Sequence, residues 1–247
     1  MADQAPSLVV DQLGFAWPNG HSALNHCCLT IPRPGLWMLV GGNGSGKSTL
    51  LRLIAGLLTP ARGRLQRPLK PALVFQNPDH QLLLPSCGSE IELALPDTVA
   101  AAERLSRVEQ ALNQVGLAGF RQRPIHSLSG GQKQRLAIAA ALASEAQLLL
   151  LDEPTALLDE TSQAEVLQLI RSLCDRQEQP ITALWITHRL EELRWCDGAA
   201  LMERGSIGPW RSGQSMEEQL APPCGREGLR GKFSGHPSGP HSSVAQR

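Results

Sequence analysis

The sequence carries no excess charge of either sign, since 23 lysine and arginine residues balance 23 aspartate and glutamate residues. Nonspecific binding to nucleic acids needs surplus cationic side chains, so this balance argues against a general polyanion-binding protein. It does not exclude a local basic patch, but we expect no nucleic-acid partner.

Long apolar runs are also absent. The longest, such as residues 148–151, are far shorter than the roughly 20 apolar residues that a membrane-spanning helix needs. The first ten residues include an acid and lack a basic segment, so they do not resemble a secretory signal. These absences favour a cytosolic globular protein.

The six cysteines show neither a CxxC pair nor the His/Cys spacing of a zinc site. We therefore expect reduced thiols, mostly in or near the core, rather than disulfides or metal ligands. They are Cys27, Cys28, Cys87, Cys174, Cys196 and Cys224.

What the sequence does contain is a succession of short apolar runs and helical patterns. The predicted strands are residues 8–17, 24–31, 36–40, 73–75, 147–151, 182–187 and 199–203. The predicted helices are residues 48–58, 98–115, 131–143 and 160–175. This order predicts an α/β domain over residues 1–210, with a mostly parallel sheet and a helical subdomain at about 79–146. Beyond it Gly, Pro, Ser and Gln dominate, so we expect residues 211–247 to be mostly disordered.

A glycine-rich turn follows the predicted strand 36–40. Residues 41–49, GGNGSGKST, match the phosphate-binding pattern G-x-x-x-x-G-K-[ST]. Glycines let successive backbone N–H groups point at phosphate oxygens, and the following helix adds its positive end. We expect Lys47 to reach the β- and γ-phosphates and Ser48 to offer its hydroxyl to Mg²⁺. A chance glycine-rich turn is the weaker interpretation, because a strand precedes the motif and a helix follows it.

Two acids follow the apolar run 148–151. A buried parallel strand that ends in Asp152 and Glu153 places both carboxylates at the edge of the sheet beside the glycine-rich turn. Asp152 then suits Mg²⁺ binding, and Glu153 can polarise an attacking water. The alternative is a strand that ends in a solvated acidic turn.

A second anion-binding helix start is predicted within residues 128–135, LSGGQKQR. Ser129 is a good N-cap, and Gly130 and Gly131 leave free N–H groups in the first turn. Two phosphate-binding helix starts in one chain suggest a nucleotide held between two copies. A simple capped helix is the alternative.

The motif LSGGQ between the other two resembles the signature of the ABC ATPase family, and the family's remaining motifs occur in order over about residues 8–207. Gln76 matches the Q-loop glutamine, residues 155–159 match the D-loop, and His188 matches the switch histidine. Trp17 lies where the family usually has a tyrosine that stacks on adenine. The resemblance implies an ATPase with the P-loop NTPase fold, in which an antiparallel N-terminal β portion accompanies the mostly parallel sheet.

The resemblance also implies a complete set of site residues. Catalysis would involve Lys47, Gln76, Glu153 and His188. ATP would be bound by Trp17, Gly41, Asn43, Gly44, Ser45, Gly46, Lys47, Ser48, Thr49, Gln76, Ser129, Gly130, Gly131, Gln132 and Asp159. Mg²⁺ would be bound by Ser48, Gln76 and Asp152.

Some positions depart from the family pattern. Gly42 replaces a common proline, which the loop should tolerate, and Arg189 follows the switch histidine in place of a second histidine or an acid. Ala156 and Leu157 replace a small pair in the D-loop. The hydroxyl missing at Ala156 puts communication between two paired sites in doubt.

Residues 75–81, FQNPDHQ, and 86–95 resemble the cobalt/nickel and energy-coupling-factor branch. That branch implies transmembrane transporter subunits as partners, a homodimer or a heterodimer with a similar ATPase, and uptake of a metal ion or vitamin. The chain would then lie in the cytoplasm on the inner face of the membrane. We expect the partner to dock in a groove beside Gln76 that residues 77–95 line, with Leu82 and Leu84 as apolar anchors. The alternative is that the leucines of this segment pack the helical subdomain.

Two other functions stay open at this point. A non-transport ABC ATPase usually has two fused cassettes or a coiled-coil insertion, and the sequence shows neither. A regulatory module would bind ATP without hydrolysing it, which the intact Glu153 and His188 disfavour.

Overall fold

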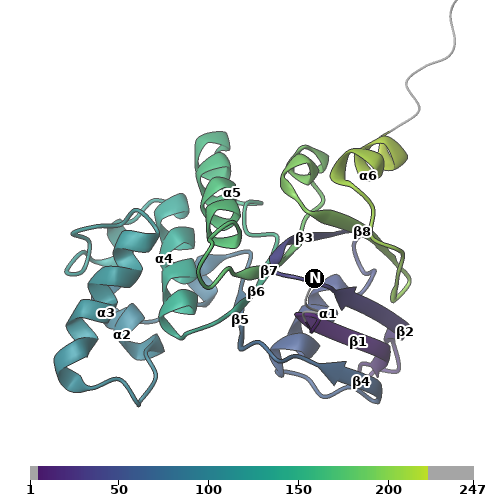
Figure 1. The fold of residues 1–247 in the computed structure, drawn as a ribbon, viewed down its shortest axis with the longest axis horizontal. Coiled ribbons are helices and arrows are strands. Elements are labelled where there is room, and N and C mark those ends of the chain that lie inside the picture. Colours follow the sequence, from purple (N-terminus) through teal and green to yellow (C-terminus); the bar gives the residue numbers. More distant parts are fainter. Residues whose placement is uncertain (1–4, 222–247) are drawn as a thin grey trace, which may run out of the picture.

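Residues 5–221, the part of the chain that the computed structural model describes, form two β-sheets and a lobe of helices (Figure 1). Within this part, one sheet is antiparallel with the strand order β2-β1-β4. The other has the order β5-β6-β7-β3-β8-β9, in which all neighbours are parallel except the short β9. The predicted α/β fold is confirmed, with its mostly parallel core sheet, antiparallel N-terminal portion and helical subdomain.

The elements have the following bounds. The strands are β1 (Leu8–Ala16), β2 (Ser22–Ile31), β3 (Gly35–Val40), β4 (Arg62–Gln66), β5 (Pro71–Val74), β6 (Leu148–Asp152), β7 (Thr182–Ile186), β8 (Gly198–Glu203) and β9 (Ser206–Ile207). The α-helices are α1 (Lys47–Ala55), α2 (Cys87–Ala94), α3 (Ala101–Gln114), α4 (Gly130–Ala143), α5 (Glu160–Cys174) and α6 (Gly213–Leu220). Three short 3₁₀ helices are η1 (Pro78–His80), η2 (Ile125–Ser127) and η3 (Leu190–Trp195).

The parallel sheet is covered on both faces because its strands are apolar at nearly every position. All of β3 and the four leucines of β6 are buried. Successive strand residues point to opposite faces, so Leu149 and Leu151 join a core with α4 and α5, whereas Leu148 and Leu150 join a core with α1. Burying one such leucine contributes about 1.5–3 kcal/mol. The sheet is therefore held between helices on both faces. The candidate site lies at the ends of its strands.

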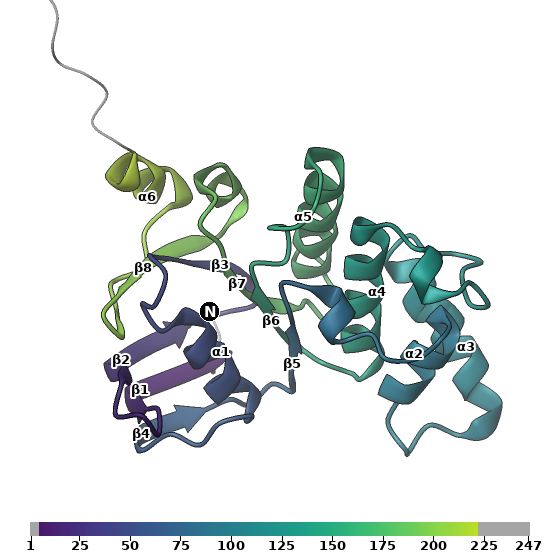
Figure 2. The ribbon, with the colours of Figure 1, turned by 180° about the vertical axis from the view of Figure 1, so that it is seen from behind.

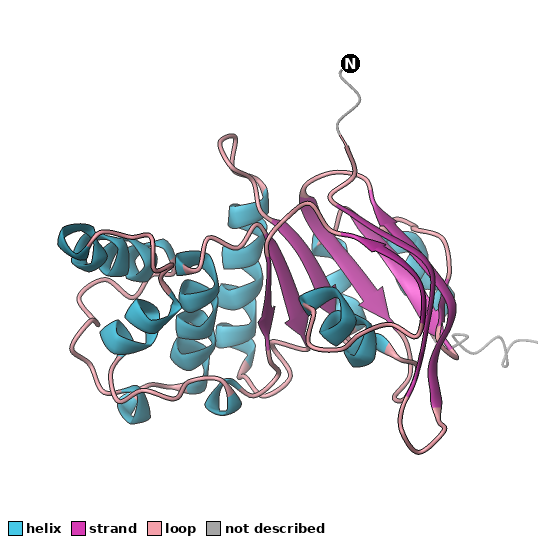
Figure 3. Cartoon of the chain, turned by 90° about the horizontal axis from the view of Figure 1, so that it is seen from below, coloured by secondary structure: helices cyan, strands magenta, loops and turns pink. Residues whose placement is uncertain are grey.

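The helices between β5 and β6 form a lobe beside the strands, as Figures 2 and 3 show from two further sides. Helix α4 joins this lobe to the rest of the chain, because it packs against α2, α3 and α5. From Leu136 to Ala143 its alanine-rich sequence is apolar all round, as the buried part of a helix requires. The limits of this subdomain and of the ATPase domain remain predictions.

The C-terminal end of the described chain differs from the sequence-based expectation. Residues 213–220 form α6, which packs against η3 and β8, whereas disorder is expected from residue 211. Ser212 caps this helix by accepting a hydrogen bond from the Ser215 N–H at 3.2 Å, and Met216 is buried. A single buried side chain in a polar segment gives too weak a helical period to predict. The rest of the expected tail, residues 222–247, lies outside the described residues.

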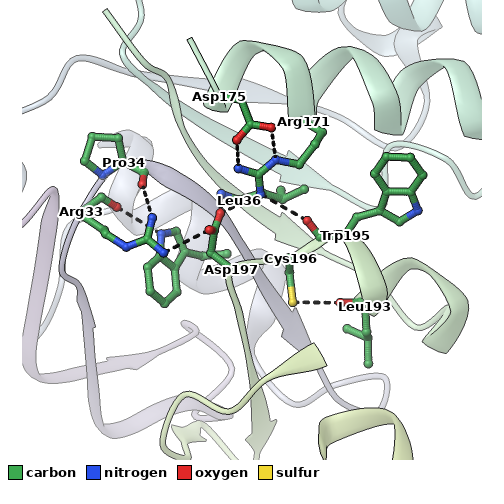
Figure 4. Close-up of polar contacts among 10 residues, drawn as sticks. Arg33, Pro34, Leu36, Arg171, Asp175, Leu193, Trp195, Cys196 and Asp197 are labelled. Carbon is green, nitrogen blue, oxygen red and sulfur yellow. Dashed lines mark hydrogen bonds and ion pairs between the residues drawn. The ribbon is translucent and has the colours of Figure 1, made fainter. Parts of the chain in front are cut away.

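A cluster of ion pairs ties α5 to the starts of β3 and β8 (Figure 4). Asp197 accepts hydrogen bonds from Arg171 at 2.7 Å and from Arg33 at 3.1 Å. It also accepts one from the Leu36 N–H at 2.9 Å, and Arg171 makes a second ion pair with the exposed Asp175. Burial alone would raise the pKa of Asp197, but these hydrogen bonds outweigh it and hold the pKa below its ordinary value.

Candidate functional site

The glycine-rich turn connects β3 to α1 at the end of the parallel sheet. Gly46 is the N-cap of α1 and has a φ of 107°, a left-handed conformation that favours glycine. A Cβ there would lie 2.5 Å from the carbonyl oxygen of Ala23, so no larger residue fits. Because no side chain caps α1, its first N–H groups are free to bind an anion.

Lys47 is the first residue of α1, directly after this turn, and is buried. Its Nζ donates to the carbonyl oxygens of Gly41 at 2.7 Å and Gly42 at 3.0 Å. Burial lowers the pKa of Lys47, while the carboxylates of Glu153 and Asp152 act in the opposite direction. The turn therefore holds one cation close to two acids.

Asp152 ends β6 and lies directly beside the start of α1. Its Oδ1 accepts a hydrogen bond from Ser48 Oγ at 3.1 Å. Burial raises the pKa of Asp152, and the hydrogen bond from Ser48 opposes the rise. The predicted meeting of the strand-end acid with the glycine-rich turn is thus present in the structure.

Glu153 has an unusual backbone and two side-chain partners. Its φ of 48° is left-handed, which few non-glycine residues adopt. Its Oε2 lies 3.2 Å from His188 Nδ1 and 3.5 Å from Gln76 Nε2. Three residues that are far apart in the sequence, from the ends of β5, β6 and β7, therefore meet at one point.

A cleft of about 250 Å³ lies next to this point. It is lined by Trp17, His21, Ala23, Asn43, Gly44, Ser45, Gly46, Lys47, Ser48, Thr49 and Glu153. The structure thus brings the aromatic ring predicted for adenine to the same cleft as the glycine-rich turn. Trp17 packs edge-to-face against Phe15, with ring centroids 5.2 Å apart. His21, which also lines the cleft, could not be predicted, because neither its spacing nor its neighbours mark it as a ligand-binding residue.

The signature residues are placed elsewhere. Among the described residues that line the cleft, none belongs to the LSGGQ motif. Ser129 caps α4 in a capping box with Gln132, and Gly130 and Gly131 form the first turn. A Cβ on Gly131 would lie 2.6 Å from Ser162 Oγ of α5, so the close packing of these two helices requires glycine.

Asp159 is likewise separate from the cleft. It caps α5, accepting hydrogen bonds from the Ser162 N–H at 3.0 Å and from Ser162 Oγ at 2.7 Å. Because Ser162 also contacts the signature turn, Asp159 and Gly131 share one neighbour. The signature turn and the glycine-rich turn thus lie at separate places in the one chain.

None of the helices within residues 5–221 is long and apolar enough to cross a membrane.

Comparisons with known proteins agree with the geometry of the site. The chain matches the ABC transporter family over residues 24–156. ABC transporter I family member 10 of Arabidopsis thaliana is 46% identical over 186 residues, covering 74% of this chain and 69% of the relative. The energy-coupling factor transporter ATP-binding protein EcfA1 of Geobacillus kaustophilus is 38% identical over 218 residues, covering 82% of this chain and 77% of the relative.

Two solved structures share the fold. CbiO1 of Clostridium perfringens, part of the ABC transporter complex CbiONQ, has a TM-score of 0.79 at 30% identity, covering 87% of this chain and 92% of that chain. The ATP-binding cassette MJ0796 is a dimer in a post-hydrolysis state bound to ADP and phosphate. It has a TM-score of 0.72 at 25% identity, covering 83% of this chain and 98% of that chain. The family match spans the glycine-rich turn, the signature and both acids. The chain therefore belongs to the ABC transporter family, as an ATP-binding and ATP-hydrolysing subunit.

Proposed function

We propose that this chain energises a membrane transporter by hydrolysing ATP, bound with Mg²⁺, in the cleft beside the glycine-rich turn. The observation that carries the proposal is the meeting of Glu153 with His188 and Gln76 next to that cleft. A strand-end acid held between two polar side chains, beside a buried lysine, is suited to phosphoryl transfer to water.

The nucleotide would be held at both of its ends. The free N–H groups at the start of α1, together with Lys47, match the charge of the phosphates. Trp17 offers an aromatic face for the adenine ring at the same cleft.

The residues beside the turn fit Mg²⁺, which prefers hard oxygen ligands. Ser48 Oγ and Asp152 Oδ1 lie 3.1 Å apart, and the Gln76 amide group lies beside Glu153, the residue that follows Asp152. When bound, the ion would neutralise charge on the phosphates. Ser48, Gln76 and Asp152 would hold it.

Hydrolysis would depend on positioning and charge stabilisation, because phosphoryl transfer needs little covalent chemistry from the protein. Glu153 would accept a hydrogen bond from the attacking water and orient it. His188 would hold the Glu153 carboxyl group and contact the γ-phosphate. Gln76 would couple the presence of the γ-phosphate to the membrane partner. The left-handed backbone of Glu153 supports this role, because strain of this kind persists where a site requires it.

The separation of the signature from the cleft supports pairing with a second ATPase. Ser129, Gly130 and Gly131 would bind the phosphates in the cleft of the other subunit. Gln132 and Asp159 would lie at the interface between the two subunits. The second subunit would be another copy or a similar ATPase. The dimer of MJ0796 bound to ADP and phosphate is consistent with this arrangement.

The partner in the membrane would dock on the helical lobe. A groove of about 300 Å³ runs between α2 and α3, lined in part by Ser89, Glu92 and Leu105. The resemblance to EcfA1 and CbiO1 supports transmembrane subunits as partners, uptake of a metal ion or vitamin, and a location on the inner face of the cell membrane.

The structure corrects the anchors expected for docking. Leu82 is buried, with 9% exposure, and Leu84 is half-buried, so neither presents a free apolar side chain. Leu83 is 76% exposed instead. The buried Glu90 carboxyl group holds the backbone of this segment, because it accepts hydrogen bonds from the N–H groups of Leu83 at 2.9 Å and Leu84 at 2.8 Å.

A mixing experiment tests the shared site. Lys47→Ala removes the phosphate lysine, and Ser129→Arg blocks the signature, so each variant alone should hydrolyse no ATP. A dimer of the two variants has one site built from two intact halves and should regain part of the activity. Cross-linking should first establish that mixed dimers form. A wild-type monomer that hydrolyses ATP at the full rate, whatever the protein concentration, would contradict the shared site.

A further inference from the structure

Glu192 is a buried carboxyl group to which the proposed mechanism assigns no role. It lies in η3, four residues after His188, and is only 5% exposed. Burying a charged side chain is costly unless hydrogen bonds or an opposite charge compensate. The partners that compensate for it therefore indicate what this side chain does.

Two buried side chains donate hydrogen bonds to this carboxyl group. Thr155 Oγ1 donates to Glu192 Oε1 at 2.6 Å, and Trp185 Nε1 donates to Glu192 Oε2 at 3.1 Å. Thr155 is 1% exposed and Trp185 is fully buried. Arg189 adds an opposite charge, with its Nε 3.7 Å from Glu192 Oε1. Each carboxyl oxygen thus has its own donor, and the donors come from different parts of the chain.

These donors flank the two residues proposed to act on the water and the γ-phosphate. Thr155 lies two residues after Glu153, and Trp185 lies three residues before His188. Through buried hydrogen bonds, Glu192 therefore connects the segment after β6 to strand β7. The same two parts of the chain also meet through the 3.2 Å contact between Glu153 and His188.

The backbone at Glu153 needs such support. A left-handed conformation at a non-glycine residue costs roughly 1–3 kcal/mol and persists only when the surroundings fix it. One backbone bond helps, from the Glu153 N–H to the Ile186 carbonyl at 3.1 Å. The side-chain bond from Thr155 to Glu192 fixes the next turn of the chain.

We infer that Glu192 is a positioning residue for ATP hydrolysis, which sets the contact between Glu153 and His188 by holding Thr155 and Trp185. The inference rests on the roles proposed above for that pair. Small displacements of a reacting group lower rates steeply, about 100-fold for 1 Å, so loosening this connection should slow turnover without weakening ATP binding.

Glu192→Gln in the full chain tests this inference. The amide keeps the shape of the side chain but has one oxygen, so its NH₂ group faces one of the two donors. We expect kcat for ATP to fall about tenfold or more, while KM for ATP stays within about twofold. Glu191→Gln is the matched control, because that neighbour is exposed and pairs with the same Arg189 at 2.7 Å. It should keep the wild-type kcat.

A second variant, Thr155→Val, removes only the hydroxyl donor. It should also lower kcat at unchanged KM, and the double variant should lose less than the product of the two single effects, because both break one connection. If Glu192→Gln does not fold, Thr155→Val carries the test alone.

Two results would overturn the inference. One is a wild-type kcat in both variants, and the other is a loss of ATP affinity as large as the loss of kcat. Glu153→Gln measured in parallel separates this inference from the proposed function. If Glu153→Gln still hydrolyses ATP, the proposed function is contradicted. If Glu153→Gln is inactive while the Glu192 and Thr155 variants are fully active, only this inference is contradicted.

Discussion

His188 Nδ1 lies 3.2 Å from Glu153 Oε2, although the two residues follow different strands of the parallel sheet. The contact is possible because β6 and β7 are neighbours in register, with Asp152 opposite Ile186. The switch histidine and the strand-end acid thus form one unit, and a ligand that displaces either side chain acts on the other.

Trp17 should contribute to ATP binding and not to the chemical step. Removing its ring with Trp17→Ala should raise KM for ATP about 5- to 150-fold, because stacking on a base is worth about 1–3 kcal/mol. The value of kcat should stay near that of the wild type. Steady-state phosphate release over a range of ATP concentrations measures both constants.

Trp17→Phe is the matched control for stacking, since it keeps an aromatic face beside Phe15. It should bind ATP more tightly than the alanine variant. Equal ATP affinity in the wild type and Trp17→Ala would mean that adenine binds elsewhere.

Leu83 should be an anchor for the membrane partner, because its side chain is 76% exposed on the helical lobe. Leu83→Glu should leave ATP hydrolysis by the isolated chain unchanged and reduce co-purification with the transmembrane subunit. Leu57→Glu is the control, since Leu57 is 61% exposed just after α1, outside the lobe. If Leu83→Glu assembles as well as Leu57→Glu, docking does not use this side chain.

Asp197 should stabilise the fold at neutral pH through its ion pairs with Arg171 and Arg33 (Figure 4). Asp197→Asn should lower the free energy of unfolding by about 1–3 kcal/mol, measured by denaturant titration at pH 7. Because the pKa of Asp197 is lowered by folding, its stabilisation is present above the unfolded-state pKa of about 3.9 and is lost as the pH falls through the folded-state pKa.

The difference between the wild type and Asp197→Asn should therefore stay constant from pH 7 to about pH 5 and shrink below that. Asp175→Asn removes the exposed partner of the same Arg171 and should cost less than about 1 kcal/mol. A difference that grows toward low pH would contradict the assigned charge state.

Local patterns predicted the parts of the site that one strand and one turn determine. The glycine-rich turn, Asp152 and Glu153 could be found because a strand, its end and the next helix start are adjacent in the sequence. The strand β4 was missed, because its polar residues are largely exposed and show no apolar alternation. Helix α6 was missed because its stability comes from packing on η3.

Features that depend on which side chains meet other segments could not be predicted. Which of the leucines at 82–84 faces outward depends on Glu90, whose carboxyl group binds two backbone N–H groups of that segment. The roles of His21 and Glu192 likewise appear only once the cleft and the buried hydrogen bonds are formed. Periodicity locates elements along the chain, but it does not say which side chains meet.

Glu153→Gln shows whether Glu153 orients the attacking water, because it removes one carboxylate and preserves the shape of the side chain. Phosphate release and ATP binding should be measured on the same preparation, with light scattering to follow association. We expect nearly unchanged ATP affinity, turnover slowed by about 100-fold or more, and a dimer that persists in ATP. Turnover near the wild-type rate would show that another group orients the attacking water and would contradict the account.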